Sequence, residues 1–172
     1  MSSFEKVIGY RSIKRELLQI CDMIRNRAIY EEIGARLPHG LLLYGNPGLG
    51  KSLLAKCFIE ESGLNTVTVR RDKGGDAFID SIKQAFTRAK EEAPAIVFLD
   101  DMDKFANEDC SHSDATEYVA VQAGIDDVKE TDVFVIATVN EICRLHGSPL
   151  HSGSSPTRHR NDSSSFLSDP SC

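Results

Sequence analysis

Residues 45–52 of this chain read Gly45-Asn46-Pro47-Gly48-Leu49-Gly50-Lys51-Ser52, which fits the phosphate-loop pattern G-x-x-x-x-G-K-[ST]. The apolar run Leu41–Tyr44 comes directly before them and is typical of a buried parallel strand. Helix formers with an apolar face follow over residues 53–59. The glycines allow a tight turn whose N–H groups point at one anion, and the helix adds its positive amino end. A strand, a glycine-rich turn and a helix in this order predict a site for a nucleoside triphosphate.

Two side chains of this loop carry the expected chemistry. Lys51 is placed to reach the β- and γ-phosphates, and Ser52 offers a hydroxyl ligand for Mg²⁺. The alternative is a glycine-rich turn that fits the pattern by chance, which the flanking strand and helix disfavour. The residues expected to surround the phosphates are Asn46, Pro47, Gly48, Leu49, Gly50, Lys51, Ser52 and Leu53.

Length and composition are those of one folded domain. The 172 residues are 41% hydrophobic and 27% charged, as in soluble globular proteins. No apolar run approaches the ~20 residues that cross a membrane, and the amino terminus lacks the charged-then-apolar pattern of a secretion signal. We therefore expect a cytoplasmic protein without a membrane partner. The net charge of −6 also disfavours a basic surface broad enough for nucleic acid.

Strands and helices alternate along the chain. This alternation predicts an α/β fold with right-handed crossovers and a parallel sheet covered by helices on both faces. Asp100 and Asn140 then follow strands at the carboxyl edge of the sheet, where open α/β sheets bind their ligands. The expected strands span residues 41–44, 65–69, 95–99 and 133–139. The expected helices span residues 12 to about 32, 53 to about 62, 76–92 and 114 to about 128. Gly63 is expected to end the second of these helices, and Asp114 to cap the fourth.

From about Arg144 the composition changes. Residues 144–172 contain nine Ser, three Pro and two Gly, and they show no apolar periodicity. We predict a folded domain over residues 1–143 and a low-complexity, disordered tail over 144–172. Three histidines in this tail are irregularly spaced, which disfavours the alternative of a metal-binding tract. The five cysteines are scattered without a C-x-x-C pair, so buried or unreactive thiols explain them better than disulfides or zinc.

Several ordered motifs before the tail resemble those of the AAA-type ATPases of the AAA+ superfamily. Ile8-Gly9 resembles the family's adenine-side turn, and Ile33–Pro38 resembles the approach to its first strand. Residues 45–52 resemble its Walker A motif, Ile96–Asp101 its Walker B motif, and Asn140 its sensor 1. The resemblance implies a three-layer P-loop NTPase core, with ATP as the nucleotide and Mg²⁺ as the metal.

The resemblance also implies roles for single residues. Asp100 would hold Mg²⁺ with Ser52, while Lys51 and Asn140 would act on the γ-phosphate or the attacking water. Ile8 and Gly9 would lie on the adenine side. Most members of the family carry Glu directly after the Walker B aspartate, as the base that polarises water. Asp101 stands there in this chain, one methylene shorter, so we expect a weaker base.

Other parts of the family pattern are not recognisable. The loop over residues 69–76 has no aromatic residue, whereas the family's polypeptide-translocating members carry one there. After Asn140 no match appears to the family's arginine fingers, fifth strand or helical lid. We therefore expect an AAA+ core that lacks its last strand and its lid. One expected assembly is the ring-shaped homo-oligomer of the family, but the absence of recognisable arginine fingers disfavours it.

Three functions remain open at this point. The first is ATP binding with Mg²⁺ and slow or impaired ATP hydrolysis. The second is a non-catalytic nucleotide-binding subunit that docks on intact relatives. The third is a P-loop phosphotransferase, which is less favoured because the sequence shows no second substrate site. A protein substrate or partner is not identified by any motif.

Overall fold

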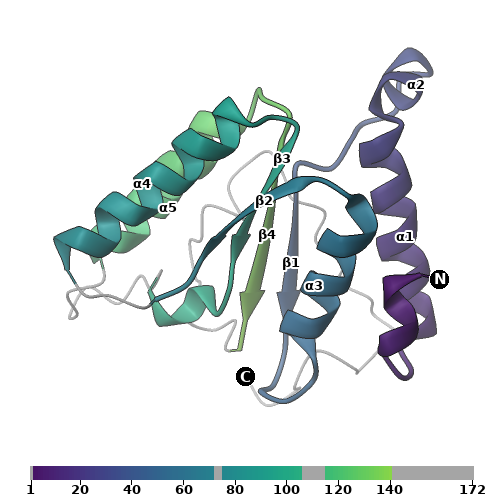
Figure 1. The fold of residues 1–172 in the computed structure, drawn as a ribbon, viewed down its shortest axis with the longest axis horizontal. Helices are drawn as coiled ribbons and strands as arrows, with labels where there is room; N and C mark the ends of the chain where they lie inside the picture. Colours follow the sequence, from purple (N-terminus) through teal and green to yellow (C-terminus); the bar gives the residue numbers. More distant parts are fainter. Residues whose placement is uncertain (1, 72–74, 106–114, 141–172) are drawn as a thin grey trace.

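The computed structural model describes residues 2–71, 75–105 and 115–140. Their four strands form one parallel sheet in the order β1-β4-β3-β2 (Figure 1). The predicted α/β class and parallel sheet are confirmed, and three of the strands begin and end where the sequence predicted them. The strands are β1 (Gly40–Tyr44), β2 (Asn65–Val69), β3 (Ala95–Leu99) and β4 (Val133–Val139).

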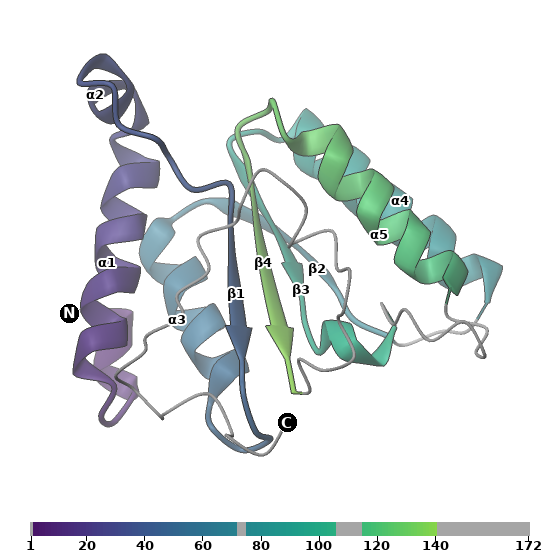
Figure 2. The ribbon, with the colours of Figure 1, turned by 180° about the vertical axis from the view of Figure 1, so that it is seen from behind.

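Helices lie on both faces of this sheet, as predicted. Figures 1 and 2 show α4 and α5 together on one face, with α1 and α3 on the other. The helices are α1 (Arg11–Arg25), α2 (Arg27–Glu32), α3 (Lys51–Ser62), α4 (Asp76–Glu91) and α5 (Ala115–Val128), with short 3-10 turns η1 (Ser3–Lys6) and η2 (Met102–Lys104).

Successive strand residues alternate between two buried cores. Val97, for example, packs under α4 and α5, whereas its neighbours Ile96 and Phe98 pack with α1 and α3. All five side chains of β3 and all seven of β4 are buried. A strand covered on both faces must be apolar throughout, which is why these two runs lack a polar alternation.

The helix predicted from residue 12 to about residue 32 is wrong as a single element, because the structure breaks it into α1 and α2 at Asn26. Asn26 has φ −108° and ψ 31°, outside the helical range. Its side-chain Nδ2 donates to Asp22 Oδ1 over 2.8 Å. No residue of α2 is buried, whereas α1 buries Leu17, Ile20 and Cys21, so the apolar face that holds α1 on the core does not continue past Asn26.

Glycine ends the phosphate-loop helix where the sequence predicted. Gly63 has φ +70° and its N–H donates to Ile59 O, which satisfies a carbonyl of the last turn of α3. At the other end Gly50 has φ +77°, so the chain enters the helix from a left-handed conformation.

Some predictions fall on residues that the structure does not describe. Asp114, expected as the cap of α5, and the tail over 144–172 lie outside the described ranges, and the domain boundary near residue 143 stays a prediction. Within the described ranges β1 is an edge strand, paired on one side with β4. Of the helices described, none has the length and apolar content needed to cross a membrane.

Candidate functional site

The phosphate loop connects the carboxyl end of β1 to the amino end of α3. It is fixed to the sheet by the N–H of Gly45, which donates to Val139 O at the end of β4 over 3.2 Å. Gly48 and Gly50 have φ of +85° and +77°, a conformation that other residues adopt only with strain. Beyond its chain neighbours, a Cβ built on either glycine meets no described atom within 4 Å, so there is open space beside the loop at both positions. The glycine conformations and this space fit an anion.

Lys51 lies inside this turn. Its side chain is 5% exposed, and its Nζ donates to Gly45 O over 2.7 Å and to Asn46 O over 2.8 Å. Burial lowers the pKa of Lys51, and the carboxylates of Asp101 and Asp103 partly offset that effect. A nearly buried ammonium that neutral carbonyl oxygens hold fits a bound phosphate, which would supply the opposite charge.

The start of α3 is joined to the end of β3 through a shared carboxylate oxygen. Ser52 Oγ donates to Asp100 Oδ1 over 2.8 Å, and Thr138 Oγ1 donates to the same oxygen over 2.9 Å. The Thr138 hydroxyl in turn accepts from the N–H of Asp101 over 2.8 Å. Mg²⁺ prefers hard oxygen ligands such as this hydroxyl and carboxylate. The donor set of Ser52 and Asp100 thus fits the metal that the sequence predicts.

Asp101 follows the buried carboxylate with φ +53° and ψ +51°, a left-handed conformation. Its Oδ2 accepts from Lys104 Nζ over 2.6 Å, and its Oδ1 accepts from Asn140 Nδ2 over 3.2 Å. The hydrogen bond from Lys104 is the main cause that lowers the pKa of Asp101, and the bond from Asn140 acts in the same direction. Asp101 is therefore ionised near neutral pH.

Asn140 is fixed from its main chain as well as its side chain. Its N–H donates to Asp103 Oδ1 over 3.1 Å, and Asp103 is itself buried. The segments that leave β3 and β4 are joined by these bonds. Five predicted residues consequently lie at one edge of the sheet: Lys51, Ser52, Asp100, Asp101 and Asn140.

The predicted adenine-side turn is less closely connected. Tyr10 OH donates to Leu49 O over 3.3 Å, which places the segment after Ile8 and Gly9 beside the phosphate loop. The Ile8 side chain is 94% exposed, so it faces solvent rather than a protein surface. The other predicted contact residues, Asn46, Pro47, Gly48, Leu49, Gly50 and Leu53, are exposed or half-buried on the loop and the first turn of α3.

Four residues of this network were not predicted from the sequence. Thr138 carries a visible signal, because it is a polar residue inside an otherwise apolar strand and is 0% exposed. Lys104 follows Asp101 at the three-residue spacing of a helical charged pair, which could have indicated their contact, whereas Asp103 carries no such signal. Tyr10 has no such signal, because only the fold brings it to Leu49.

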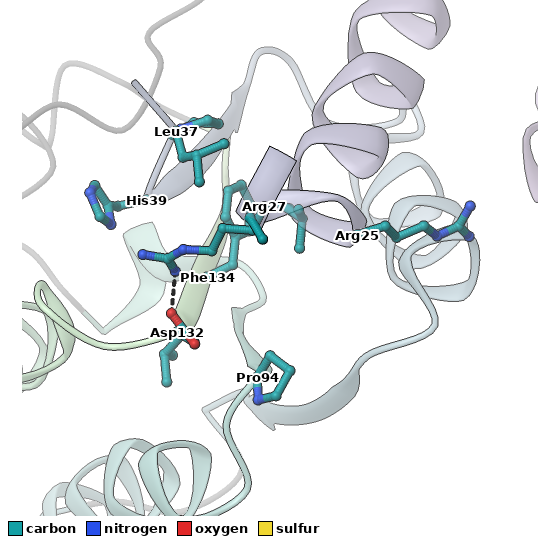
Figure 3. A pocket seen from close by; sticks show the side chains of 11 residues that line it. Arg25, Arg27, Leu37, His39, Pro94, Asp132 and Phe134 are labelled. Atoms are coloured by element: carbon teal, nitrogen blue, oxygen red, sulfur yellow. Dashed lines mark ion pairs between the residues drawn. The ribbon is translucent and has the colours of Figure 1, made fainter. Parts of the chain in front are cut away.

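A separate pocket of about 240 Å³ lies at the opposite ends of the strands (Figure 3). His39, Pro94 and Asp132 directly precede β1, β3 and β4, and Phe134 lies one residue inside β4. Arg27, after the break at Asn26, forms an ion pair with Asp132 across this pocket. This cavity is not part of the phosphate site. Over the described residues, no group of three or more His, Cys, Asp or Glu side chains is arranged to hold a metal ion.

Comparison with known proteins agrees with this geometry. The sequence model of the family described as "ATPase family associated with various cellular activities (AAA)" matches residues 41–154. The chain is 37% identical over 105 residues to the ATP-dependent zinc metalloprotease FtsH 3 of Symbiobacterium thermophilum, covering 59% of this chain and 17% of that protein. It is 32% identical over 162 residues to the FtsH of Leptotrichia buccalis, covering 87% of this chain and 21% of that protein.

These relatives are much longer, and the chain spans about a fifth of their length. The family match covers more than half of the chain. It includes β1, the phosphate loop, β3 and β4, which together carry the clustered residues. The chain belongs to the AAA family of ATPases.

Proposed function

We propose that this chain binds ATP together with Mg²⁺ and hydrolyses it slowly. Membership of the AAA family makes it an ATPase module with a nucleotide site. The observation that supports the finer proposal is the convergence of Lys51, Ser52, Asp100, Asp101 and Asn140 at one sheet edge. Together these side chains supply the ammonium, hydroxyl, carboxylate and amide groups that ATP hydrolysis uses.

Binding would depend first on Lys51. Its ammonium would exchange the carbonyl oxygens of Gly45 and Asn46 for phosphate oxygens, which are charged and therefore form stronger hydrogen bonds. The open space beside Gly48 and Gly50 would receive those phosphates, and the amino end of α3 would add its partial positive charge. Ile8 and Gly9 would lie toward the base, since the neighbouring Tyr10 contacts the loop.

Ser52 and Asp100 would hold the metal. Mg²⁺ bound there would neutralise charge on the β- and γ-phosphates. The Ser52 hydroxyl now donates to Asp100, so it would turn to present a lone pair to the metal. Thr138 would keep Asp100 in place through its own hydrogen bond to the same oxygen.

Asp101 would accept the proton of the attacking water, and Asn140 would orient that water or contact the γ-phosphate. The aspartate side chain is one methylene shorter than the glutamate usual in the family. A carboxylate displaced by about 1.5 Å costs on the order of a hundredfold in rate unless the backbone compensates. The proposed turnover is slow for this reason.

A non-catalytic subunit is the second candidate function, and one observation favours it. Both carboxylate oxygens of Asp101 are already engaged by Lys104 and Asn140. A chain with an impaired base could still bind nucleotide and dock on intact relatives. Ring assembly is typical of the family and is a proposal for this chain.

The proposed function is tested by calorimetry with Mg-ATP together with a turnover assay. Lys51→Ala should abolish binding. Lys56 is an exposed lysine on the same helix, so Lys56→Ala should leave binding unchanged. Asp101→Asn should keep the affinity and remove turnover. Unchanged affinity in Lys51→Ala would refute the phosphate site. Binding without turnover, both alone and after mixing with an intact relative, would favour the non-catalytic subunit.

A further inference from the structure

Lys104 is a charged neighbour of the proposed base that the family resemblance does not explain. Its Nζ lies 2.6 Å from Asp101 Oδ2, and the two residues are three positions apart. The Lys104 side chain is 56% exposed, while that of Asp101 is 18% exposed. The contact is therefore a charge-assisted hydrogen bond between an exposed donor and a sheltered carboxylate.

The main chain of Lys104 is fixed although its side chain is exposed. Its N–H donates to Asp101 O over 2.9 Å, and its carbonyl accepts from Arg71 Nη1 over 2.7 Å. Arg71 Nη2 also lies 3.8 Å from Oε1 of Glu117, whose side chain is buried in α5. Asp101 and Arg71, which is itself paired with Glu117 of α5, thus hold the main chain of Lys104 in place, so its side chain starts from a fixed position beside Asp101.

We infer that Lys104 restrains Asp101 and thereby slows ATP hydrolysis, an inference that rests on the proposed function. A general base needs a carboxylate oxygen within hydrogen-bond reach of the water. Asn140 binds Oδ1, and Lys104 binds the oxygen that would otherwise accept the proton. Both carboxylate oxygens therefore already accept a hydrogen bond.

This geometry predicts different results for a lysine that restrains Asp101 and for a lysine that positions it. Asp101 would stay oriented without Lys104, because Asn140 still binds Oδ1 and the backbone N–H of Asp101 is held by Thr138. Loss of the ammonium would free Oδ2 while leaving the carboxylate in place. A lysine needed for positioning would give the opposite result, because its removal would lower the rate.

The test uses three variants of the full chain in steady-state ATP hydrolysis and calorimetry. Lys104→Met keeps most of the apolar stem and removes the charge, and Lys104→Arg keeps the charge. Lys129→Met is the matched control, because Lys129 binds Asp126 over 2.6 Å at the same three-residue spacing, on the surface at the end of α5. An exposed pair is worth up to about 1 kcal/mol, which corresponds to a change in rate of up to about fivefold.

We expect Lys104→Met to raise kcat by up to about fivefold with KM and the Mg-ATP dissociation constant unchanged. Lys104→Arg and Lys129→Met should keep the parent values. An unchanged or lower kcat in Lys104→Met would overturn the inference, and so would absent turnover in both parent and variant. A lower kcat with a raised KM would place Lys104 on the phosphates instead. Retained binding and measurable parent turnover with no gain in kcat refute only the restraint, whereas absent binding or absent turnover in the parent refutes the proposed function.

Discussion

Ser52 Oγ and Asp100 Oδ1 lie 2.8 Å apart, although 48 positions separate the two residues in the chain. The bond joins the first turn of α3 to the carboxyl end of β3. Thr138 at the end of β4 donates to the same oxygen, so three elements meet at one atom. The proposed metal ligands are therefore brought together by the sheet and the phosphate-loop helix.

Asp100→Asn should weaken ATP binding only when Mg²⁺ is present. The amide oxygen can still accept from Ser52 and Thr138, so the fold should persist, but the charge that attracts the metal is lost. We expect a loss of about tenfold or more in affinity with Mg²⁺ and little change with EDTA. Calorimetry under both conditions measures this difference.

Asp127→Asn provides the matched control for that experiment. Asp127 pairs with Lys90 on the exposed surface of α5 and lies outside the proposed site. Its substitution should leave both affinities at the parent value. An equal loss with and without Mg²⁺ in Asp100→Asn would contradict a metal role and point to a general disturbance of the loop.

The strands were predictable because their residues favour the strand conformation and also suit the burial that the sheet gives them. β2 is rich in β-branched residues, and β3 and β4 are apolar runs that only a sheet covered on both faces can bury. The phosphate loop was predictable because its glycines, lysine and serine serve one local geometry. The resulting placement of Asp100 and Asn140 then follows from the parallel sheet.

The rest had no local pattern strong enough to predict it. The break at Asn26 follows the end of the buried face of α1, because α2 has no buried residues. Thr138 and Lys104 carried weak local signals, but their partners Asp100 and Asp101 were shown only by the fold. The exposed side chain of Ile8 likewise could not be foreseen, since a motif gives the position of a residue but not the direction of its side chain.

Cys21 should be unreactive in the folded protein. Its side chain is 1% exposed, its thiol donates to Phe58 O over 3.7 Å, and burial raises its pKa to about 12. Burial limits the access of a reagent to the thiol, and the raised pKa keeps the fraction of reactive thiolate small. Alkylation at about pH 8 followed by mass spectrometry should label Cys21 only after unfolding. Rapid labelling of the native chain would contradict its burial.

The raised pKa of Cys21 also predicts a dependence of stability on pH. The contribution is complete below the unfolded-state value near 9.0 and is lost as the pH rises toward about 12, because only the unfolded thiol ionises in that window. At one unit above the unfolded value the loss is about 1.4 kcal/mol. Urea unfolding at about pH 8 and about pH 10 should show a smaller loss in Cys21→Ala than in the parent. Equal losses would contradict the shift.

Gly124→Ala should destabilise the protein even though alanine is the better helix former. A Cβ on Gly124 would lie 2.3 Å from Cδ2 of Phe86, the point where α5 approaches α4. Overpacking of this kind costs about 1–3 kcal/mol, which exceeds the gain of up to about 1 kcal/mol in helix propensity. Urea unfolding measures the change. Adding Phe86→Leu should recover part of the loss, and no coupling between the two substitutions would refute a steric cause.

The edge of the sheet at β1 provides the last prediction. In the described sheet β1 pairs with β4 on one side, where His39 O accepts from Val135 N and Gly45 N donates to Val139 O. Since alternate residues of a strand face the same neighbour, Leu41 and Leu43 bond to β4 while Leu42 and Tyr44 point their amides away from it. We expect Leu42 and Tyr44 to exchange their amide hydrogens faster than Leu41 and Leu43.

An open apolar edge also favours association with another strand. Protection of the Leu42 and Tyr44 amides should therefore rise with protein concentration, and sedimentation should show self-association over the same range. Leu42→Lys would place a charge on the buried face of the strand and disturb folding, so the informative change is Tyr44→Pro, which removes an amide at the half-buried end of β1. Tyr44→Pro should reduce self-association. Strong protection of both amides in a monodisperse monomer would contradict the open edge, because another part of the chain would then have to cover it.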